Sequence, residues 1–127
     1  MPRYIYSKVL DLEGTAKVGS GECAALVQHY AGAPLAASWR AGPAIRGAHN
    51  VAVGTALATF VNGRYPNQRH GNHAALYISQ DATGVLVMDQ WASKQSVSSR
   101  VIRFKGKNKD GSYKDPSNNA DALSIIE

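Results

Sequence analysis

The chain has 127 residues, of which 44% are hydrophobic and 18% charged, with a net charge of +5. This balance predicts one globular domain with a single core over residues 1–127, and it excludes a disordered tail. A single cysteine excludes an internal disulfide framework and a zinc site built on several thiolates. The basic residues gather in the run RFKGKNKDGSYK, whose Gly, Asn and Asp content predicts a solvated surface loop. The alternative is that this charge attracts an anionic polymer or an acidic protein partner. Nucleic acid is not expected, because the basic residues are not interleaved with stacking aromatic residues.

The amino-terminal stretch MPRYIYSKVLDLEGTAKVG does not read as a secretory signal. It has no charged start, apolar run or small-residue cleavage site. No part of the chain approaches the length needed to span a bilayer, so no membrane span is expected. We therefore expect synthesis in the cytoplasm without a signal peptide, and delivery by other machinery if the protein acts outside the cell.

The first predicted element is a helix over residues 21–31, GECAALVQHYA. Ser20 is a candidate N-cap, and Gly32 is a candidate stop. One face of this helix holds residues at three- and four-residue intervals, which are Cys23, Leu26, Val27 and Tyr30. Such spacing predicts that this face packs into the core.

The rest of the chain is expected to be mostly β-structure. Pro and Gly residues between 34 and 50 predict an irregular loop. Later apolar or alternating runs predict strands over 55–61, 73–79, 85–91, 99–104 and 122–127. One early helix followed mainly by strands indicates an α+β fold, in which the helix packs on an antiparallel sheet.

Cys23 is the candidate nucleophile. A thiol must lose its proton to react, and the free N–H groups and dipole of a helix amino terminus favour the thiolate. The same N–H groups can stabilise an oxyanion, and Gly21 would let a substrate backbone approach closely. Two observations oppose this interpretation: a small residue on an apolar face is often simply buried, and Glu22 places a negative charge beside the thiol.

The candidate base is His73, because it opens a predicted strand that can hold its ring rigidly. His29 lies six residues beyond Cys23 and would point to another face of the helix. His49 and His70 fall in predicted loops. The run HGNH, which joins His70 to His73, is a weak candidate for a metal pair because no carboxylate accompanies it. We expect no metal and no other cofactor.

A third group should accept the other N–H of the histidine ring. The pairing of the two central strands decides which residue that is. If Ser79 pairs with Val85, Asp89 shares a face with the histidine; if Gln80 pairs with Val85, Gln90 does. Asp89 is the first choice because a carboxylate is the stronger acceptor, and Gln90 remains the alternative.

These runs resemble a known family. GSGECAALVQ is similar to the nucleophile helix of CHAP and NlpC-type amidases, which are papain-like cysteine hydrolases of bacterial cell walls. VGTALATF, GNHAALYIS and VLVMDQW are similar to the family's following strands, so the resemblance covers residues 19–31 and 54–91. It implies a papain-like core with Cys23 as nucleophile, His73 as general base and then acid, and Asp89 or Gln90 as the orienting residue.

The chain is also similar to small amidases without signal peptides, such as type VI secretion effectors and phage lysins. That resemblance implies cleavage of an amide bond in the stem peptide of peptidoglycan, in the periplasm or cell wall of a target bacterium. For an injected toxin it implies a cognate immunity protein. Gly21, Trp39 and Trp91 are the expected substrate-binding residues, although core packing explains both tryptophans, and Tyr65, equally well.

Two other functions fit the same residues. A cysteine peptidase or acyltransferase acting on a protein substrate would use the same thiol, histidine and polar third residue. A binding module that keeps the fold without the chemistry would carry an unreactive Cys23.

Overall fold

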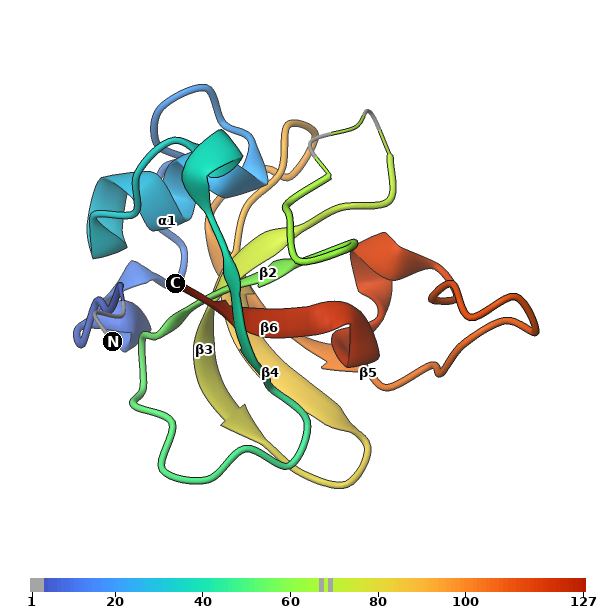
Figure 1. The fold of residues 1–127 in the computed structure, drawn as a ribbon. Coiled ribbons are helices and arrows are strands. Elements are labelled where there is room, and N and C mark those ends of the chain that lie inside the picture. The colour runs from blue at the N-terminus through green and yellow to red at the C-terminus, as the bar shows by residue number, and fades with distance from the viewer. Residues whose placement is uncertain (1–3, 67, 69) are drawn as a thin grey trace.

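The computed structural model describes residues 4–66, 68 and 70–127. These residues form one antiparallel sheet with the strand order β1-β6-β2-β3-β4-β5 (Figure 1). The strands are β1 (Ala41–Ala44), β2 (Ala56–Thr59), β3 (Ala74–Gln80), β4 (Gly84–Asp89), β5 (Ser98–Arg103) and β6 (Leu123–Ile126). The helices in these residues are α1 (Cys23–Ala31) and the short 3-10 turns Val9–Leu12, Ala36–Ser38, Pro116–Asn118 and Ala120–Ala122. The predicted α+β class is confirmed.

The helix α1 lies on one face of the sheet because its apolar side packs there. Leu26 and Val27 are fully buried and share a core with Ala74 and Leu76 of β3. The helix ends as predicted at Gly32, which adopts φ 75° and donates its N–H to a carbonyl of the last turn. Helix and strand therefore place the first turn of α1 beside the start of β3.

The start of α1 differs from the prediction by two residues. The helix begins at Cys23 with Glu22 as N-cap, not at residue 21 with Ser20 as cap. Gly21 has φ +84°, a left-handed value that a right-handed helix cannot contain. Ser20 instead accepts a hydrogen bond from the Glu22 N–H at 3.3 Å. As a result Cys23 occupies the first helical position, where backbone N–H groups have no partner within the helix.

The central strands are apolar on both sides because each face of the sheet carries its own core. Leu76 and Met88 face α1, whereas Tyr77 and Val87 belong to a second core on the opposite face. β4 lies inside the sheet, since it pairs with β3 on one side and β5 on the other.

The β3–β4 hairpin contains both of the pairings considered for it. The pairs are Gln80–Val85 and Ser79–Leu86 near the turn, then Tyr77–Val87 and Leu76–Met88 beyond it. The register shifts at a bulge between Tyr77 and Ser79. Beyond the bulge the pairing is the one that puts Asp89 on the same face as His73.

One strand was not expected. β1 lies within residues 34–50, which were predicted to be an irregular loop, and it pairs with β6 at the edge of the sheet with a register irregularity. Its sequence, AGPA, contains Pro43, which is tolerated only on an edge strand or at a bulge. The Gly and Pro residues of this segment are typical of loops, and for this reason the sequence did not predict the strand.

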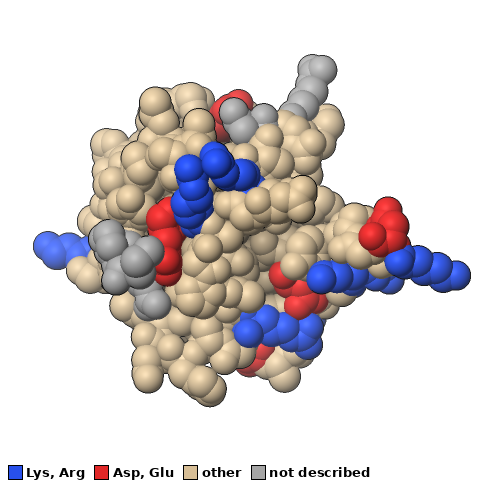
Figure 2. All heavy atoms as spheres, in the orientation of Figure 1, with Lys and Arg blue, Asp and Glu red and all other residues tan. Residues whose placement is uncertain are grey.

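The basic segment after β5 is a surface loop, as its composition indicates. In Figure 2 basic side chains project from the loop at the right of the view, which Figure 1 colours orange to red. Lys105 pairs with Asp115 at 2.8 Å, and the Lys107 ammonium lies 5.1 Å from the Tyr113 ring centroid. Among the described residues, none of the helices is long and apolar enough to cross a membrane.

Candidate active site

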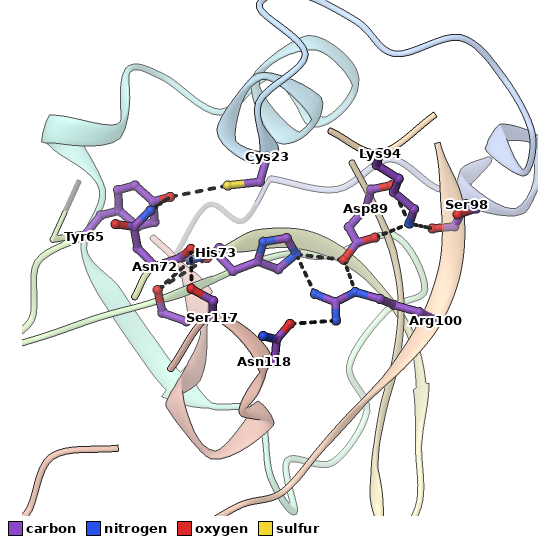
Figure 3. Close-up of polar contacts among 11 residues, drawn as sticks. Cys23, Tyr65, Asn72, His73, Asp89, Lys94, Ser98, Arg100, Ser117 and Asn118 are labelled. Atoms are coloured by element: carbon purple, nitrogen blue, oxygen red, sulfur yellow. Dashed lines mark hydrogen bonds and ion pairs between the residues drawn. The ribbon is translucent and has the colours of Figure 1, made fainter. Parts of the chain in front are cut away.

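Three predicted site residues come together at one end of the sheet. Cys23 begins α1, His73 directly precedes β3, and Asp89 is the last residue of β4. The His73 Nε2 atom lies 2.7 Å from the Asp89 Oδ2 atom. Figure 3 shows the His73 ring between Cys23 and Asp89, with its other nitrogen on the side of the sulfur. A thiol, an imidazole and a carboxylate in this order are chemically able to serve nucleophilic catalysis.

The backbone of His73 is held by its neighbour strand. Its N–H donates to the Thr59 hydroxyl at 3.0 Å, and its carbonyl accepts the Thr59 N–H at 3.0 Å. The residue is only 5% exposed. The ring is therefore held in place from two sides, by β2 through the backbone and by Asp89 through Nε2.

Asp89 is fully buried and has two cationic partners besides the histidine. Lys94 Nζ lies 2.7 Å from Oδ1, and Arg100 Nε lies 2.7 Å from Oδ2. Burial alone would raise the pKa of Asp89, but the hydrogen bond and charge of His73, the charge of Arg100 and the hydrogen bond from Lys94 lower it to about 2. The carboxylate therefore stays ionised and keeps a proton on His73 Nε2.

Arg100 and Lys94 are site residues that the sequence analysis did not find. β5 pairs with β4 so that Arg100 lies opposite Val87 and Ser98 opposite Asp89. Arg100 is thus one diagonal step from the carboxylate on the same face, and its Nη1 also donates to Asn118 at 3.0 Å. The signal that could have found it is the parity of the predicted strand 99–104, once paired with its neighbour.

The thiol and the imidazole influence each other's protonation. Burial alone would raise the pKa of Cys23, but His73, the Tyr65 hydroxyl and the Ala74 amide lower it below its usual value. Burial alone would lower the pKa of His73, but Asp89 and Cys23 raise it above its usual value. The lowered pKa of Cys23 and the raised pKa of His73 both favour a thiolate–imidazolium pair. Because the two groups interact, they titrate together as one coupled pair.

A cleft of about 830 Å³ opens onto the sulfur and the histidine. Its lining comes from the start of α1, the segment before β3, the segment after β4, β5 and the 3-10 turn Pro116–Asn118. The lining residues are Glu22, Cys23, Ala24, Tyr65, Gln68, His70, Asn72, His73, Trp91, Ala92, Ser93, Arg100, Ser117 and Asn118. Trp91, one of the expected substrate-binding residues, lies on this cleft.

The structure corrects two of the expected substrate-binding residues. Trp39 is fully buried, and its indole N–H donates to the Pro34 carbonyl at 2.8 Å. Gly21 is buried as well and does not line the cleft. An indole whose N–H is already bonded gains most by full burial, so Trp39 supports the core beside Tyr65.

Gln90, the alternative third residue, faces the loop before Cys23 and not the histidine ring. Its amide accepts from the Val18 N–H at 3.0 Å and donates to the carbonyls of Val18 at 3.0 Å and Glu22 at 2.8 Å. Since the side chain is fully buried, these bonds are protected from water. Gln90 therefore fixes the turn from which α1 begins.

Replacing Gln90 by leucine is expected to lower the unfolding free energy by about 2–3 kcal/mol, because the Val18 N–H and the carbonyls of Val18 and Glu22 lose the partner that Gln90 gives them. Urea denaturation measures this. The rate at which iodoacetamide alkylates Cys23 should change too, since the turn before the thiol is released. Gln80→Leu is the matched control: it frees the Gly47 N–H and the Ile45 carbonyl, far from the thiol. Equal changes of Cys23 reactivity in both variants would contradict the assignment.

The histidines of the HGNH run do not share a metal-binding arrangement. His73 uses Nε2 for Asp89, whereas His70 is exposed at the cleft. Within residues 4–66, 68 and 70–127, no group of three or more His, Cys, Asp or Glu residues is placed to hold a metal ion.

Comparison with known proteins identifies the family of this chain. A model of domesticated amidase effector 2 (Dae2) matches residues 5–126. A "Type VI secretion amidase effector 2 protein" from Salmonella typhi is 47% identical over 131 residues, covering 98% of each chain. The solved structure "Type 6 secretion amidase effector 2 (Tae2)" has a TM-score of 0.91 and 46% identity, covering 98% of this chain and 94% of that chain. The expected similarity to type VI secretion amidase effectors is confirmed, and the likeness to CHAP and NlpC amidases stays a prediction. The chain belongs to the domesticated amidase effector 2 family.

Proposed function

We propose that this protein is a cysteine amidase that hydrolyses an amide bond in the stem peptide of peptidoglycan. The observation that carries the proposal is the single cysteine at the start of α1, facing a buried histidine–carboxylate pair on an open cleft. The names of the relatives, which are amidase effectors, support an amide bond as the target. Peptidoglycan is proposed from the resemblance of the Cys23 and His73 runs to cell-wall amidases.

In the first half-reaction the Cys23 thiolate attacks the substrate carbonyl carbon. A sulfur–carbon bond forms, and the carbonyl π pair moves onto oxygen. The resulting oxyanion is stabilised by the Cys23 backbone N–H at the start of α1. The His73 imidazolium then gives its proton to the amide nitrogen, and the carbon–nitrogen bond breaks as the carbonyl reforms. The amine departs, and the acyl group stays on Cys23 as a thioester.

In the second half-reaction water replaces the amine. Neutral His73 accepts a proton from the water as its oxygen bonds to the thioester carbon, and the sulfur leaves as thiolate. Asp89 stabilises the imidazolium in both half-reactions and holds the ring's orientation. The Asp89 carboxylate itself takes no proton, which agrees with its low pKa.

The setting of this chemistry is proposed from the relatives. The Salmonella typhi protein and the solved structure are both named type VI secretion effectors. This protein would accordingly be delivered into the periplasm or cell wall of a target bacterium. A cognate immunity protein that covers the cleft would protect the producing cell.

The test is release of new amines from purified peptidoglycan sacculi. Because the chain has one cysteine, iodoacetamide alkylates only Cys23, and amine release should fall in proportion to the alkylated fraction. Mock-treated protein is the control. Undiminished release by fully alkylated protein would exclude thiol catalysis. A panel of folded proteins, assayed in parallel, tests the peptidase alternative, which predicts cleavage there and not in sacculi.

A further inference from the structure

The steps above give no role to Tyr65, although its hydroxyl is in contact with the nucleophile. The Tyr65 Oη atom lies 3.6 Å from the Cys23 Sγ atom. Tyr65 is only 8% exposed, and its ring packs edge-on against Trp39 with centroids 4.8 Å apart. Trp39 is itself anchored by its indole N–H. The hydroxyl is therefore held in position by the core, independently of any substrate.

The hydrogen bonds around Asn72 determine where the hydroxyl proton of Tyr65 points. Asn72 Oδ1 accepts the Gln68 N–H at 2.8 Å, which turns the amide so that Nδ2 faces Tyr65. Nδ2 lies 3.0 Å from Oη and can only donate. The phenol oxygen is the acceptor in that bond, so its own proton is directed to another acceptor. The sulfur of Cys23 is in that place, as Figure 3 shows.

We propose that Tyr65 is a further catalytic residue, whose O–H donates a hydrogen bond to the Cys23 thiolate in the resting protein and to the substrate oxyanion after attack. The second half of this statement rests on the proposed function. During attack the electron pair of the carbonyl bond moves to oxygen, and the Tyr65 hydroxyl keeps its proton while bonding to that oxygen. Together with the Cys23 N–H it supplies two donors to the oxyanion.

The surroundings of Tyr65 suit a donor that does not ionise. Burial and the charge of Cys23 raise the pKa of the phenol above its ordinary value. The hydroxyl therefore retains its proton throughout the pH range in which the thiolate forms. This donor also explains how a thiolate persists beside Glu22, whose charge opposes it.

The test is Tyr65→Phe, which removes one oxygen and keeps the packed ring. We expect kcat on sacculi to fall on the order of 10²-fold, the usual effect of losing one oxyanion donor, with KM changed little. The pH profile of Cys23 alkylation should move to higher pH. The matched control is Tyr77→Phe: Tyr77 is similarly buried, at 7% exposed, but belongs to the core on the opposite face of the sheet. It should change neither quantity.

A second variant tests the direction of the proton. In Asn72→Asp the carboxylate can only accept, so the Tyr65 proton turns to it and away from the sulfur. The added negative charge also disfavours the thiolate. In the Tyr65→Phe background only this charge effect remains, so Asn72→Asp should shift the alkylation profile less there than in the wild type.

The two readouts separate the failure of this proposal from that of the proposed function. An unchanged alkylation profile or an unchanged kcat in folded Tyr65→Phe would overturn the role of Tyr65 while leaving thiol catalysis intact. Equal shifts by Asn72→Asp in both backgrounds would overturn it too. If the wild type released no amines, the proposed amidase function would be refuted, and with it the proposal that Tyr65 donates to a substrate oxyanion. The alkylation profile would still decide whether Tyr65 stabilises the thiolate.

Discussion

Cys23→Ala is expected to lower kcat for amine release from sacculi by at least about 10⁴-fold, the scale seen when a covalent nucleophile is removed. Among the described residues of the cleft, no serine hydroxyl is hydrogen-bonded to the His73 ring, so none can take over as nucleophile with His73 as its base. The remaining donors would bind substrate without forming a thioester, so substrate binding should survive. Initial rates and pull-down with sacculi separate the two effects.

The fold of this variant should be retained, which makes the result interpretable. The Cys23 side chain is half-buried, and alanine is a good helix former at the first position of α1. We expect the unfolding free energy to change by less than about 1 kcal/mol. An active, folded Cys23→Ala protein would refute the thiol mechanism.

Asp89→Asn is expected to lower the unfolding free energy by about 3 kcal/mol. The carboxylate is fully buried between Lys94 and Arg100, whose side chains are 13% and 24% exposed. Breaking a buried ion pair from one side leaves the other charge uncompensated. The new amide also brings a donor where the neighbours already donate. Urea denaturation at neutral pH measures the loss, and a change within about 0.5 kcal/mol would show that the cluster contributes little.

The same substitution should change how stability depends on acid. The pKa of Asp89 falls from the ordinary 3.8 to about 2 on folding, so its contribution is complete above 3.8 and is lost as the pH falls toward 2. This difference corresponds to about 2 kcal/mol. The wild type should therefore lose more stability than Asp89→Asn over that interval, because the other carboxyl groups are common to both. Parallel curves would contradict the role assigned to Asp89.

The sequence predicted the parts of the site that depend on local signals. A cysteine at the start of an apolar helical repeat and a histidine before an alternating run are both visible within a dozen residues. The two-residue period of strands reduced the third group to Asp89 or Gln90, and Asp89 was preferred as the stronger acceptor. The helix start was wrong by two residues because the sequence does not show that Gly21 takes a left-handed conformation.

The residues that sequence reasoning missed depend on contacts far apart in the chain. Arg100 reaches Asp89 only through the β4–β5 register, and Lys94 through a turn between those strands. Tyr65 meets Cys23 across 42 positions of sequence. None of these has a local motif, because a lysine, arginine or tyrosine in a polar or aromatic run is most often a surface or core residue. Their importance lies in what they touch.

The bulge in β3 determines the charge of the group behind the histidine. With the turn as it is, an unbroken ladder from the Gln80–Val85 pair would carry Gln90 to the face of His73, and Asp89 would point to the opposite side. The extra residue between Tyr77 and Ser79 reverses that choice. Closing the bulge into a regular ladder from the Gln80–Val85 pair, with the chain length unchanged, would therefore exchange a charged histidine partner for a neutral one without changing any residue of the site itself.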